Sequence, residues 1–289
     1  MNIKFSHRYS LTVLLVGITA ITAFGRTCIP DHAAISETVT TVKQLGYQAL
    51  SGVVNAILRR VSRETSEFQH SLEQAHGLPS WLFKRLKKDW GVDTLEQLCR
   101  DLKGVAPLTL RTNERVVSRE EYLEILTEED IDAHACQLSE VGIVLEQAVQ
   151  IPALPGFEHG GFSVQDEHAQ LCATLLPNLA DKFVVDACAA PGGKTAHLLE
   201  KYTPKKLIAL DQDAKRLVRV AENLERLELN QFTEVEILAA DATTWETSEP
   251  VDCIVLDAPC SAIGVMRRHP DIRLLRQSTD IQQTVELQQ

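Results

Sequence analysis

The stretch VVDACAAPGGKTAHLLEKY (184–202) runs from β-branched residues through a glycine pair into a segment with helical spacing. Its Gly193-Lys194-Thr195 ends like a phosphate-binding P-loop, whose pattern is G-x-x-x-x-G-K-[ST]. The first glycine of that pattern lets the backbone wrap a phosphate, and Cys188 stands in its place. The stretch therefore predicts a strand, a glycine turn and a helix, and it leaves the ligand of the turn open.

The surrounding sequence alternates strands with helices from residue 171 onward. The predicted strands are FVVDAC (183–188), KLIALD (206–211), EVEILAAD (234–241) and VDCIVLDAP (251–259). In the long helix after the second strand, the predicted apolar stripe consists of Leu217, Val218, Val220, Leu224 and Leu227. Near-continuous apolar strands separated by helices indicate a parallel sheet covered on both faces. Ligands of such sheets bind beyond the carboxyl ends of the strands.

Four acidic residues lie at those strand ends, namely Asp186, Asp211, Asp241 and Asp257. A single acid there is often only a turn or helix cap, but four acids at one sheet edge indicate a ligand. A triphosphate would be repelled by this ring of carboxylates. S-adenosylmethionine suits it better, because it carries a positive sulfonium, a ribose diol and an adenine. The turn is therefore predicted to hold a methyl donor rather than a phosphate.

Each residue of the predicted site has an expected role. Asp211 lies about 20 residues beyond the glycines, where a carboxylate accepts bonds from both ribose hydroxyls. Asp241 is expected at the adenine edge, and Lys194 is expected to order the loop. The residues expected near the methionine part are Asp186, Gly192 and Gly193.

The stretch DAPCSAIGVMRRHPDIR (257–273) follows the last predicted strand. Pro259 stiffens the turn, and Cys260 is expected beside the methyl donor at the sheet edge. Basic residues follow, and a phosphate backbone could bind to them. They are Arg267, Arg268, His269, Arg273 and Arg276.

Composition limits the class of protein. A chain of 289 residues is long enough for two domains. Its net charge of −11 argues against a protein that coats nucleic acid, but it allows a local basic face. Seven scattered cysteines form no disulfide framework, and none of them has zinc-site spacing, so we expect no metal. A reduced, cytoplasmic protein is the simplest interpretation.

Two regions precede the parallel sheet. Residues 1–75 are predicted to be helical: one helix opens at Pro30-Asp31 and stops at Gly46, and a second has Val53, Val54, Ile57, Leu58 and Val61 on its apolar face. The second helix ends in Arg59-Arg60, a pair that could contact RNA but more commonly is a solvated helix end. Residues 76–170 are predicted to mix an amphipathic helix in LPSWLFKRLKKDWG, a strand in PLTLRTN, a helix in SREEYLEILTEED and a brief strand at 162–164.

The first 27 residues allow two interpretations. Lys4 and Arg8 precede about 15 mostly apolar residues and the small residues Ala23 and Gly25, which together resemble a secretory signal. The segment is too short and interrupted to span a membrane, which needs about 20 residues. The alternative, which the rest of the sequence favours, is a buried helix of an all-α domain.

Four stretches resemble the RsmB/Sun (Fmu) ribosomal RNA cytosine-5 methyltransferases. They are DACAAPGGKT, LDAPCSAIGVMRRHPDIR, LPGFEHGGFSVQDEHAQ and IPDHAAISETV. The resemblance implies a NusB-like RNA-binding domain (1–75), an RNA-contacting region (76–170) and a Rossmann-like methyltransferase domain (171–289). It further implies S-adenosylmethionine as donor, a cytidine C5 of small-subunit ribosomal RNA as acceptor, and a monomer without membrane contact.

The resemblance also assigns residues. By motif match, the cofactor-binding positions are Cys188, Ala189, Ala190, Pro191, Gly192, Gly193, Lys194, Asp211, Asp241 and Asp257. The RNA-binding residues are expected to be Arg267, Arg268 and His269. A cysteine is needed because C5 of cytosine becomes nucleophilic only after a thiolate adds at C6, and RNA enzymes of this family use two cysteines. Cys260 matches the cysteine associated with product release.

The family's nucleophile lies in a later Thr-Cys motif, after a further strand. The only Thr-Cys pair in this sequence is Thr27-Cys28, in the helical region, which does not match that context. We therefore expect a chain shortened at both ends, with the strand at 251–259 left as a sheet edge. Three alternatives remain open: a non-catalytic RNA-binding remnant, an enzyme with Cys260 as nucleophile, and a P-loop nucleotidase that depends on Lys194.

Overall fold

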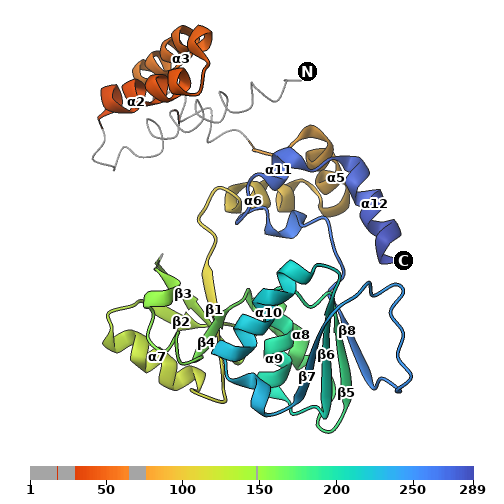
Figure 1. The fold of residues 1–289 in the computed structure, drawn as a ribbon. Coiled ribbons are helices and arrows are strands. Elements are labelled where there is room, and N and C mark those ends of the chain that lie inside the picture. Colours follow the sequence, from red (N-terminus) through yellow and green to blue (C-terminus); the bar gives the residue numbers. More distant parts are fainter. Residues whose placement is uncertain (1–17, 19–29, 65–75, 148) are drawn as a thin grey trace. The chain divides into compact units, whose positions relative to one another are not determined.

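A computed structural model describes residues 18, 30–64, 76–147 and 149–289 (Figure 1). The chain divides into two compact units, residues 1–79 with 86–100 and residues 80–85 with 101–289. The N-terminal apolar stretch, for which we weighed a signal against a buried helix, lies outside the described residues apart from Ile18, as does Thr27-Cys28.

The first unit contains a helical hairpin. Helix α2 (Asp31–Gln44) ends before Gly46, whose φ of +83° stops it as predicted, and α3 (Ser51–Arg63) follows a short 3-10 helix at Gln48–Leu50. Val42 and Leu58 pack between the two helices. Val53 and Ile57 are exposed, so the apolar face predicted for α3 was too wide.

Two helices follow, α5 (Ser80–Trp90) and α6 (Val92–Asp101). Helix α5 begins after Pro79 and ends at Gly91, where φ is +83°. Leu82 is buried and the lysines of the helix are exposed, which confirms the amphipathic prediction.

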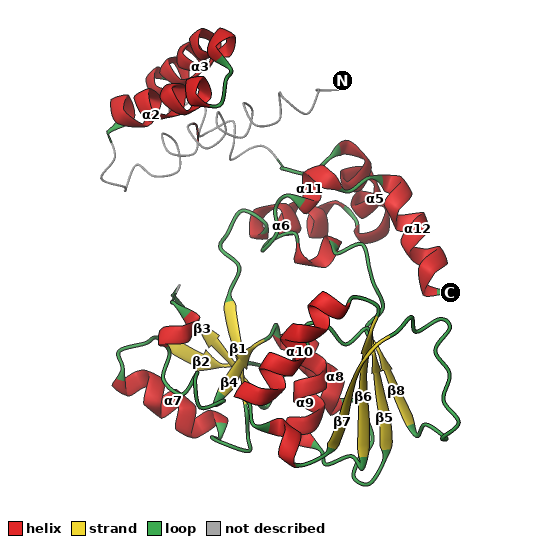
Figure 2. Ribbon diagram, viewed as in Figure 1, coloured by secondary structure: helices red, strands yellow, loops and turns green. Residues whose placement is uncertain are grey.

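A small antiparallel sheet begins the second unit proper, with strand order β2-β3-β1-β4 (Figure 2). Its strands are β1 (Leu108–Thr112), β2 (Ala133–Ala135), β3 (Gly142–Leu145) and β4 (Phe162–Val164). Helix α7 (Arg119–Glu128) opens with a capping box between Ser118 and Glu121 and packs Tyr122 and Leu126 onto the sheet. A 3-10 turn at Ile151–Ala153 precedes β4. The sequence predicted β1, α7 and β4 but missed β2 and β3.

A four-stranded parallel sheet forms the rest of the second unit, in the order β7-β6-β5-β8. Its strands are β5 (Phe183–Ala187), β6 (Lys206–Asp211), β7 (Glu234–Ala239) and β8 (Cys253–Leu256). The parallel α/β prediction is thus confirmed, and in the described chain β8 lies at an edge of the sheet. Every residue of β5 is buried, as expected for a central parallel strand.

The helices of this sheet cover one of its faces. Helices α8 (Glu167–Thr174), α9 (Gly193–Lys201) and α10 (Ala214–Arg226), with a 3-10 turn at Leu229–Gln231, lie on the same side of the strands (Figure 2). We expected cover on both faces, and among the described residues the helices provide it on one face only. On the opposite face, Trp245 and Val251 of the β7–β8 connection pack on Phe183 and Val185 instead.

Two details of the sheet's surroundings differ from expectation. Val218 of α10 is 55% exposed, so it does not belong to the stripe that Leu217, Val220 and Leu224 form. On β8, Ile254 and Leu256 are exposed as well.

The chain after β8 contains a 3-10 turn at Ile263–Val265, the short helix α11 (Ile272–Leu275) and helix α12 (Ser278–Gln288). Throughout the described residues, no helix combines the length and apolar character that crossing a membrane requires.

Candidate cofactor-binding site at the carboxyl edge of the parallel sheet

The glycine turn between β5 and α9 has a left-handed backbone at two positions. Cys188 has φ +65° and Gly192 has φ +100°, and the Gly192 N–H donates to the Ala189 carbonyl at 2.7 Å. A Cβ at Gly192 would lie 3.1 Å from the Cα of Val220, so α10 passes directly behind the turn. Glycine is therefore required here for both conformation and space.

Two side chains of α10 fix the turn from behind. Arg216 Nη2 donates to the Ala190 carbonyl at 2.7 Å, and Asn223 Nδ2 donates to the Pro191 carbonyl at 2.9 Å. Sequence reasoning missed both residues. Their spacing of two helical turns, on the face of α10 that meets the loop, was the available signal.

Asp186 is the most buried acid of the edge. Its Oδ2 accepts a 2.6 Å bond from Thr195 Oγ1 of α9, while its Oδ1 has no hydrogen-bond partner among the described residues. Burial raises the pKa of Asp186 to about 6, and the carboxylates of Asp257 and Asp211 act in the same direction. A carboxylate oxygen buried without a partner is costly, so a bound donor would be stabilised there.

Asp211 ends β6 and is 4% exposed. Its Oδ2 accepts from the Ala190 N–H at 3.2 Å, and its Oδ1 accepts from the Asp213 N–H at 3.0 Å. The carboxylate thus ties the β6 end to the glycine turn, and it lies at the same edge as Asp186. Its role toward a ribose remains a prediction.

Asp241 lies two residues beyond β7 and is exposed. Its Oδ1 accepts from the Thr243 N–H at 2.9 Å and from the Thr243 hydroxyl at 2.7 Å, and these bonds lower the pKa of Asp241. The acid caps its own turn, and its role toward an adenine remains a prediction.

Lys194 connects the glycine turn to the loop after β8. Its Nζ lies 2.5 Å from Asp257 Oδ2. Three residues farther on, Cys260 is exposed, and its Sγ accepts from the Ala262 N–H at 3.4 Å. Cys188 is less exposed than Cys260, and burial raises the pKa of its thiol. Of these two cysteines, Cys260 is the accessible one.

Three of the arginines after Cys260 contact the main chain of residues 102–107. Arg267 Nη2 donates to the Val105 carbonyl at 2.7 Å, Arg268 Nη2 to the Pro107 carbonyl at 3.0 Å, and Arg273 Nη2 to the Leu102 carbonyl at 2.9 Å. These bonds use part of each guanidinium, and they fasten the loop after β8 to the start of the small sheet. The RNA-binding role of Arg267, Arg268 and His269 remains a prediction.

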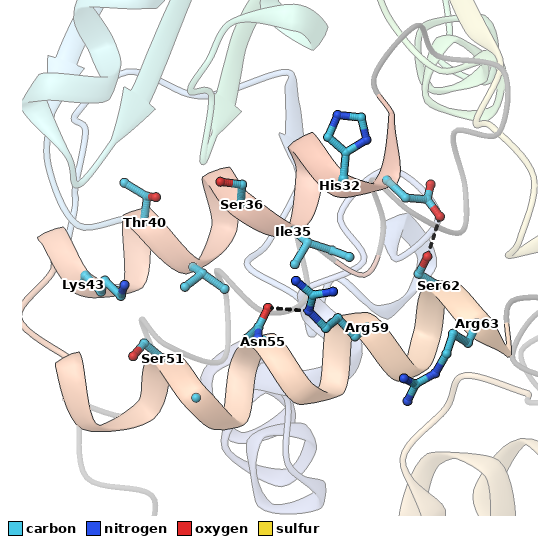
Figure 3. Close-up of a pocket in the computed structure, with 13 residues that line it drawn as sticks. His32, Ile35, Ser36, Thr40, Lys43, Ser51, Asn55, Arg59, Ser62 and Arg63 are labelled. Atoms are coloured by element: carbon cyan, nitrogen blue, oxygen red, sulfur yellow. Dashed lines mark hydrogen bonds between the residues drawn. The ribbon is translucent and has the colours of Figure 1, made fainter.

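A separate groove of about 730 Å³ lies between α2 and α3 (Figure 3). Its lining mixes the apolar Ile35 and Val39 and the acidic Asp31 with polar and basic side chains, namely His32, Lys43, Asn55, Arg59 and Arg63. Arg59 Nε donates to Asn55 Oδ1 at 3.2 Å, which holds the guanidinium along the groove.

Arg59 and Arg60 are adjacent in the sequence but make different contacts. Arg60 pairs with Glu64 on the exposed surface of α3, with Nε 2.8 Å from Oε2. Arg59, as described, lines the groove instead.

The sheet-edge residues fit S-adenosylmethionine better than a nucleoside triphosphate. Among the described residues one buried Asp186 oxygen lacks a donor, and the ammonium of S-adenosylmethionine is a donor that a nucleoside triphosphate lacks, because phosphates only accept. The left-handed Gly192 permits close backbone approach. Across the described residues, no group of three or more His, Cys, Asp and Glu side chains is arranged to hold a metal ion.

Three segments of the chain match known protein families. Residues 173–289 match "16S rRNA methyltransferase RsmB/F", residues 78–152 match "Methyltr_RsmF/B-like, ferredoxin-like domain", and residues 2–63 match the NusB family. Two solved structures share the fold. The crystal structure of PH0851 aligns with 97% of this chain and 64% of its own at TM-score 0.78 and 23% identity. That of NSun6 from Pyrococcus horikoshii with SFG aligns with 74% and 78% at TM-score 0.65 and 20% identity.

Curated relatives named "Ribosomal RNA small subunit methyltransferase B" are similar along nearly the whole chain. The protein of Pseudomonas putida is 46% identical over 96% of this chain and 63% of its own length. That of Vibrio vulnificus is 39% identical over 99% of this chain and 67% of its own length. The chain thus spans somewhat under two thirds of the Pseudomonas relative. These matches agree with the parallel sheet, its glycine turn and the carboxylates at its edge. The chain belongs to the RsmB/F family of 16S rRNA methyltransferases.

Proposed function

We propose that the chain binds S-adenosylmethionine at the carboxyl edge of its parallel sheet and serves the methylation of C5 of a cytidine in small-subunit ribosomal RNA. The ion pair between Lys194 and Asp257 is the observation that carries this proposal. It joins the glycine turn, where the donor would bind, to the loop that presents Cys260. Donor and thiol would therefore meet at one edge of the sheet.

The residues that would hold the cofactor surround the glycine turn. When bound, S-adenosylmethionine supplies an electrophilic methyl group. Asp186 offers the oxygen that has no partner among the described residues to an ammonium or hydroxyl donor, and the 188–194 backbone would approach the ligand closely. Asp211, whose carboxylate already accepts from the Ala190 N–H of the turn, would accept from a ribose hydroxyl. Asp241, on the neighbouring strand end, would meet the base.

Cys260 is proposed to act in product release. Addition of a thiolate at C6 of cytosine makes C5 nucleophilic, and the thiolate leaves when the C5 proton is lost. The exposure of Cys260 lets it reach an RNA base. Lys194, paired with Asp257 beside the loop, holds positive charge near the site. The thiolate that adds to C6 would come from a cysteine other than Cys260.

RNA is proposed to bind at two places. The groove between α2 and α3 presents Lys43, Arg59 and Arg63, which suit a phosphate backbone. Arg267, Arg268 and His269 follow Cys260 in the sequence and would contact RNA near the reacting base. We expect a monomer that works in the cytoplasm, and light scattering of the purified chain tests the oligomeric state.

A covalent trap separates the proposed role of Cys260 from that of a nucleophile. The chain would be incubated with S-adenosylmethionine and small-subunit ribosomal RNA that contains 5-fluorocytosine, and adducts would be counted on a denaturing gel. If Cys260 serves release, it forms no adduct of its own, and the Cys260→Ala variant does not reduce trapping. An adduct that disappears in Cys260→Ala would overturn this role and make Cys260 the nucleophile.

The acceptor atom is tested by mass spectrometry of nucleosides after reaction with unmethylated RNA. The proposal expects any product to be 5-methylcytidine, and a methyl group on N4 or on a ribose would contradict it. Good binding of both cofactor and RNA without product would favour the alternative of an RNA-binding protein that does not catalyse.

A further inference from the structure

We propose that Arg111, on the small antiparallel sheet, is a positioning residue for the cofactor turn. It lies in β1, 82 residues before Gly193 in the sequence, and its side chain is 0% exposed. This inference rests on the proposed function, since it concerns cofactor binding at the same turn. It adds a residue that would control the turn without touching the cofactor.

The hydrogen bonds of Arg111 connect the small antiparallel sheet to helix α9. Its Nε and Nη2 donate to the two carboxylate oxygens of Glu200 on α9, both at 2.7 Å. Its Nη1 donates to the carbonyl of Gly193 at 2.8 Å and to Gln165 Oε1 at 2.5 Å. Four donor–acceptor contacts thus fix one planar guanidinium, and the two to Glu200 form a bidentate fork.

The Gly193 carbonyl is the point at which this connection meets the site. Gly193 is the first residue of α9 and follows Gly192, the left-handed residue of the turn. A hydrogen bond to this carbonyl fixes the orientation of the Gly193–Lys194 peptide plane. Because Lys194 reaches Asp257 from that same peptide, Arg111 also supports the contact that joins the two loops of the site.

Glu200 and Gln165 hold Arg111 in place. Glu200 lies near the end of α9, and its side chain is 3% exposed. Its ion pair with Arg111 therefore lies on the buried side of the helix. Gln165 belongs to the segment after β4, where its N–H donates to the Thr109 carbonyl at 3.1 Å. The Gln165 carbonyl in turn accepts from the buried Gln170 at 2.9 Å.

Arg115, in the turn between β1 and α7, provides a matched control because it contacts the same helix, α9. Its Nε donates to the Leu199 carbonyl at 2.8 Å and its Nη2 to the Tyr202 carbonyl at 2.9 Å, both at the far end of α9. Arg115 and Arg111 therefore both stabilise α9, but only Arg111 reaches the end that carries the glycine turn. A purely structural role predicts the same result for Arg111→Lys and Arg115→Lys.

The first measurement is the dissociation constant of S-adenosylhomocysteine, at a temperature where each variant is folded. Lysine keeps the charge of Arg111 but cannot serve the fork and the Gly193 carbonyl together. We expect Arg111→Lys to weaken binding by about tenfold or more, the scale of one hydrogen bond from a charged donor. Arg115→Lys should lower the unfolding midpoint but leave the constant within about twofold. Equal constants in the two variants would overturn the inference.

A double variant protects the test against misfolding, because removing one partner of a buried ion pair is strongly destabilising. Arg111→Met with Glu200→Leu replaces the pair by apolar side chains of similar size, which buried sites often tolerate. This variant should fold and yet bind S-adenosylhomocysteine weakly, because the Gly193 carbonyl loses its donor. Wild-type affinity in the folded double variant would contradict the proposal.

Hydrogen–deuterium exchange of the ligand-free chain separates this inference from the proposed function. Arg111→Lys should speed exchange in peptides that cover 188–197, and Arg115→Lys should speed it around 199–203. If the wild type bound no S-adenosylhomocysteine, the cofactor proposal would fail while the exchange pattern still decided the role of Arg111. An unchanged rate of hydrogen–deuterium exchange at 188–197 in Arg111→Lys would contradict the positioning role even if the cofactor binds.

Discussion

At the scale of single residues, the site combines strained backbone with an unsatisfied charge. Cys188 holds a left-handed φ value, which is unfavourable for a residue other than glycine, and Asp186 is buried with one oxygen unpartnered in the described chain. Both features cost stability in the ligand-free protein. They are compatible with function if a ligand satisfies them, which gives two predictions.

Asp186→Asn should stabilise the ligand-free protein and weaken cofactor binding. Because burial raises the folded-state pKa of Asp186 to about 6, the folded state holds its proton more tightly than the unfolded state. Stability from this group therefore falls as pH rises from about 4 to about 6, by about 3 kcal/mol at most. Urea unfolding at pH 8 should show the variant to be more stable, and calorimetry should show weaker binding of S-adenosylhomocysteine. A less stable variant with unchanged affinity would refute this account.

Gly192→Ala should damage the turn. The added Cβ would meet Val220 Cα at 3.1 Å, and φ +100° is unfavourable for alanine. We expect a loss of about 1–3 kcal/mol in the free energy of unfolding together with loss of cofactor binding. Gly52→Ala is the control, because a Cβ there meets nothing within 4 Å. Similar thermal midpoints for both variants would show that this position tolerates a side chain and would contradict this account.

At the scale of elements, helix α9 is buried over most of its length. Six consecutive residues, Thr195 to Glu200, are buried between the parallel sheet and the elements that cover it. The helix carries the glycine turn at one end, so its position sets the site. His197, in its middle, is 4% exposed.

His197 should make the protein sensitive to acid. Burial, together with the positive charges of Arg111 and Lys201, lowers the pKa of His197 to about 3. The unfolded state therefore binds the proton first, and stability falls as pH drops from about 6.5 toward 3, on the order of 4 kcal/mol. Unfolding measured across this range should show a shallower pH dependence in His197→Gln. His168→Gln, at a side chain 78% exposed, should keep the wild-type dependence, and the reverse pattern would contradict the assignment.

The sequence predicted the elements of the parallel sheet well, because each strand is a local apolar run with an acid at its end. It missed β2 and β3, which have three and four residues and too little periodicity to identify. It also missed Arg111 and Glu200. Their side chains meet across 89 residues of sequence, and no local pattern marks such a pair. The acids of the site were predictable because topology brings strand ends together, whereas the residues that hold the turn depend on packing between elements.

At the scale of the whole molecule, basic side chains gather locally although the chain as a whole is acidic. The chain carries 40 acidic and 29 basic residues, yet basic side chains gather in the α2–α3 groove and after Cys260. An acidic protein binds RNA only through such local groups, because affinity depends on the charges near the phosphates.

RNA binding should therefore depend on salt only moderately. If about three basic side chains contact phosphates, a plot of log K against log salt should have a slope of about −2 for single-stranded RNA. Filter binding with a small-subunit ribosomal RNA fragment measures it, and Arg268→Gln should reduce the slope by about 0.7. Arg100→Gln, an exposed arginine of α6, should leave it unchanged. A slope near zero would indicate that the groups named here do not contact phosphate.

The central claim is that the carboxyl edge of the parallel sheet holds a methyl donor rather than a nucleotide phosphate. Isothermal titration of the chain with S-adenosylhomocysteine, and in parallel with ATP and Mg²⁺, tests it most directly. The account predicts that one S-adenosylhomocysteine binds per chain and raises the unfolding midpoint, and that ATP does neither. Binding and hydrolysis of ATP that require Lys194, without binding of S-adenosylhomocysteine, would contradict it.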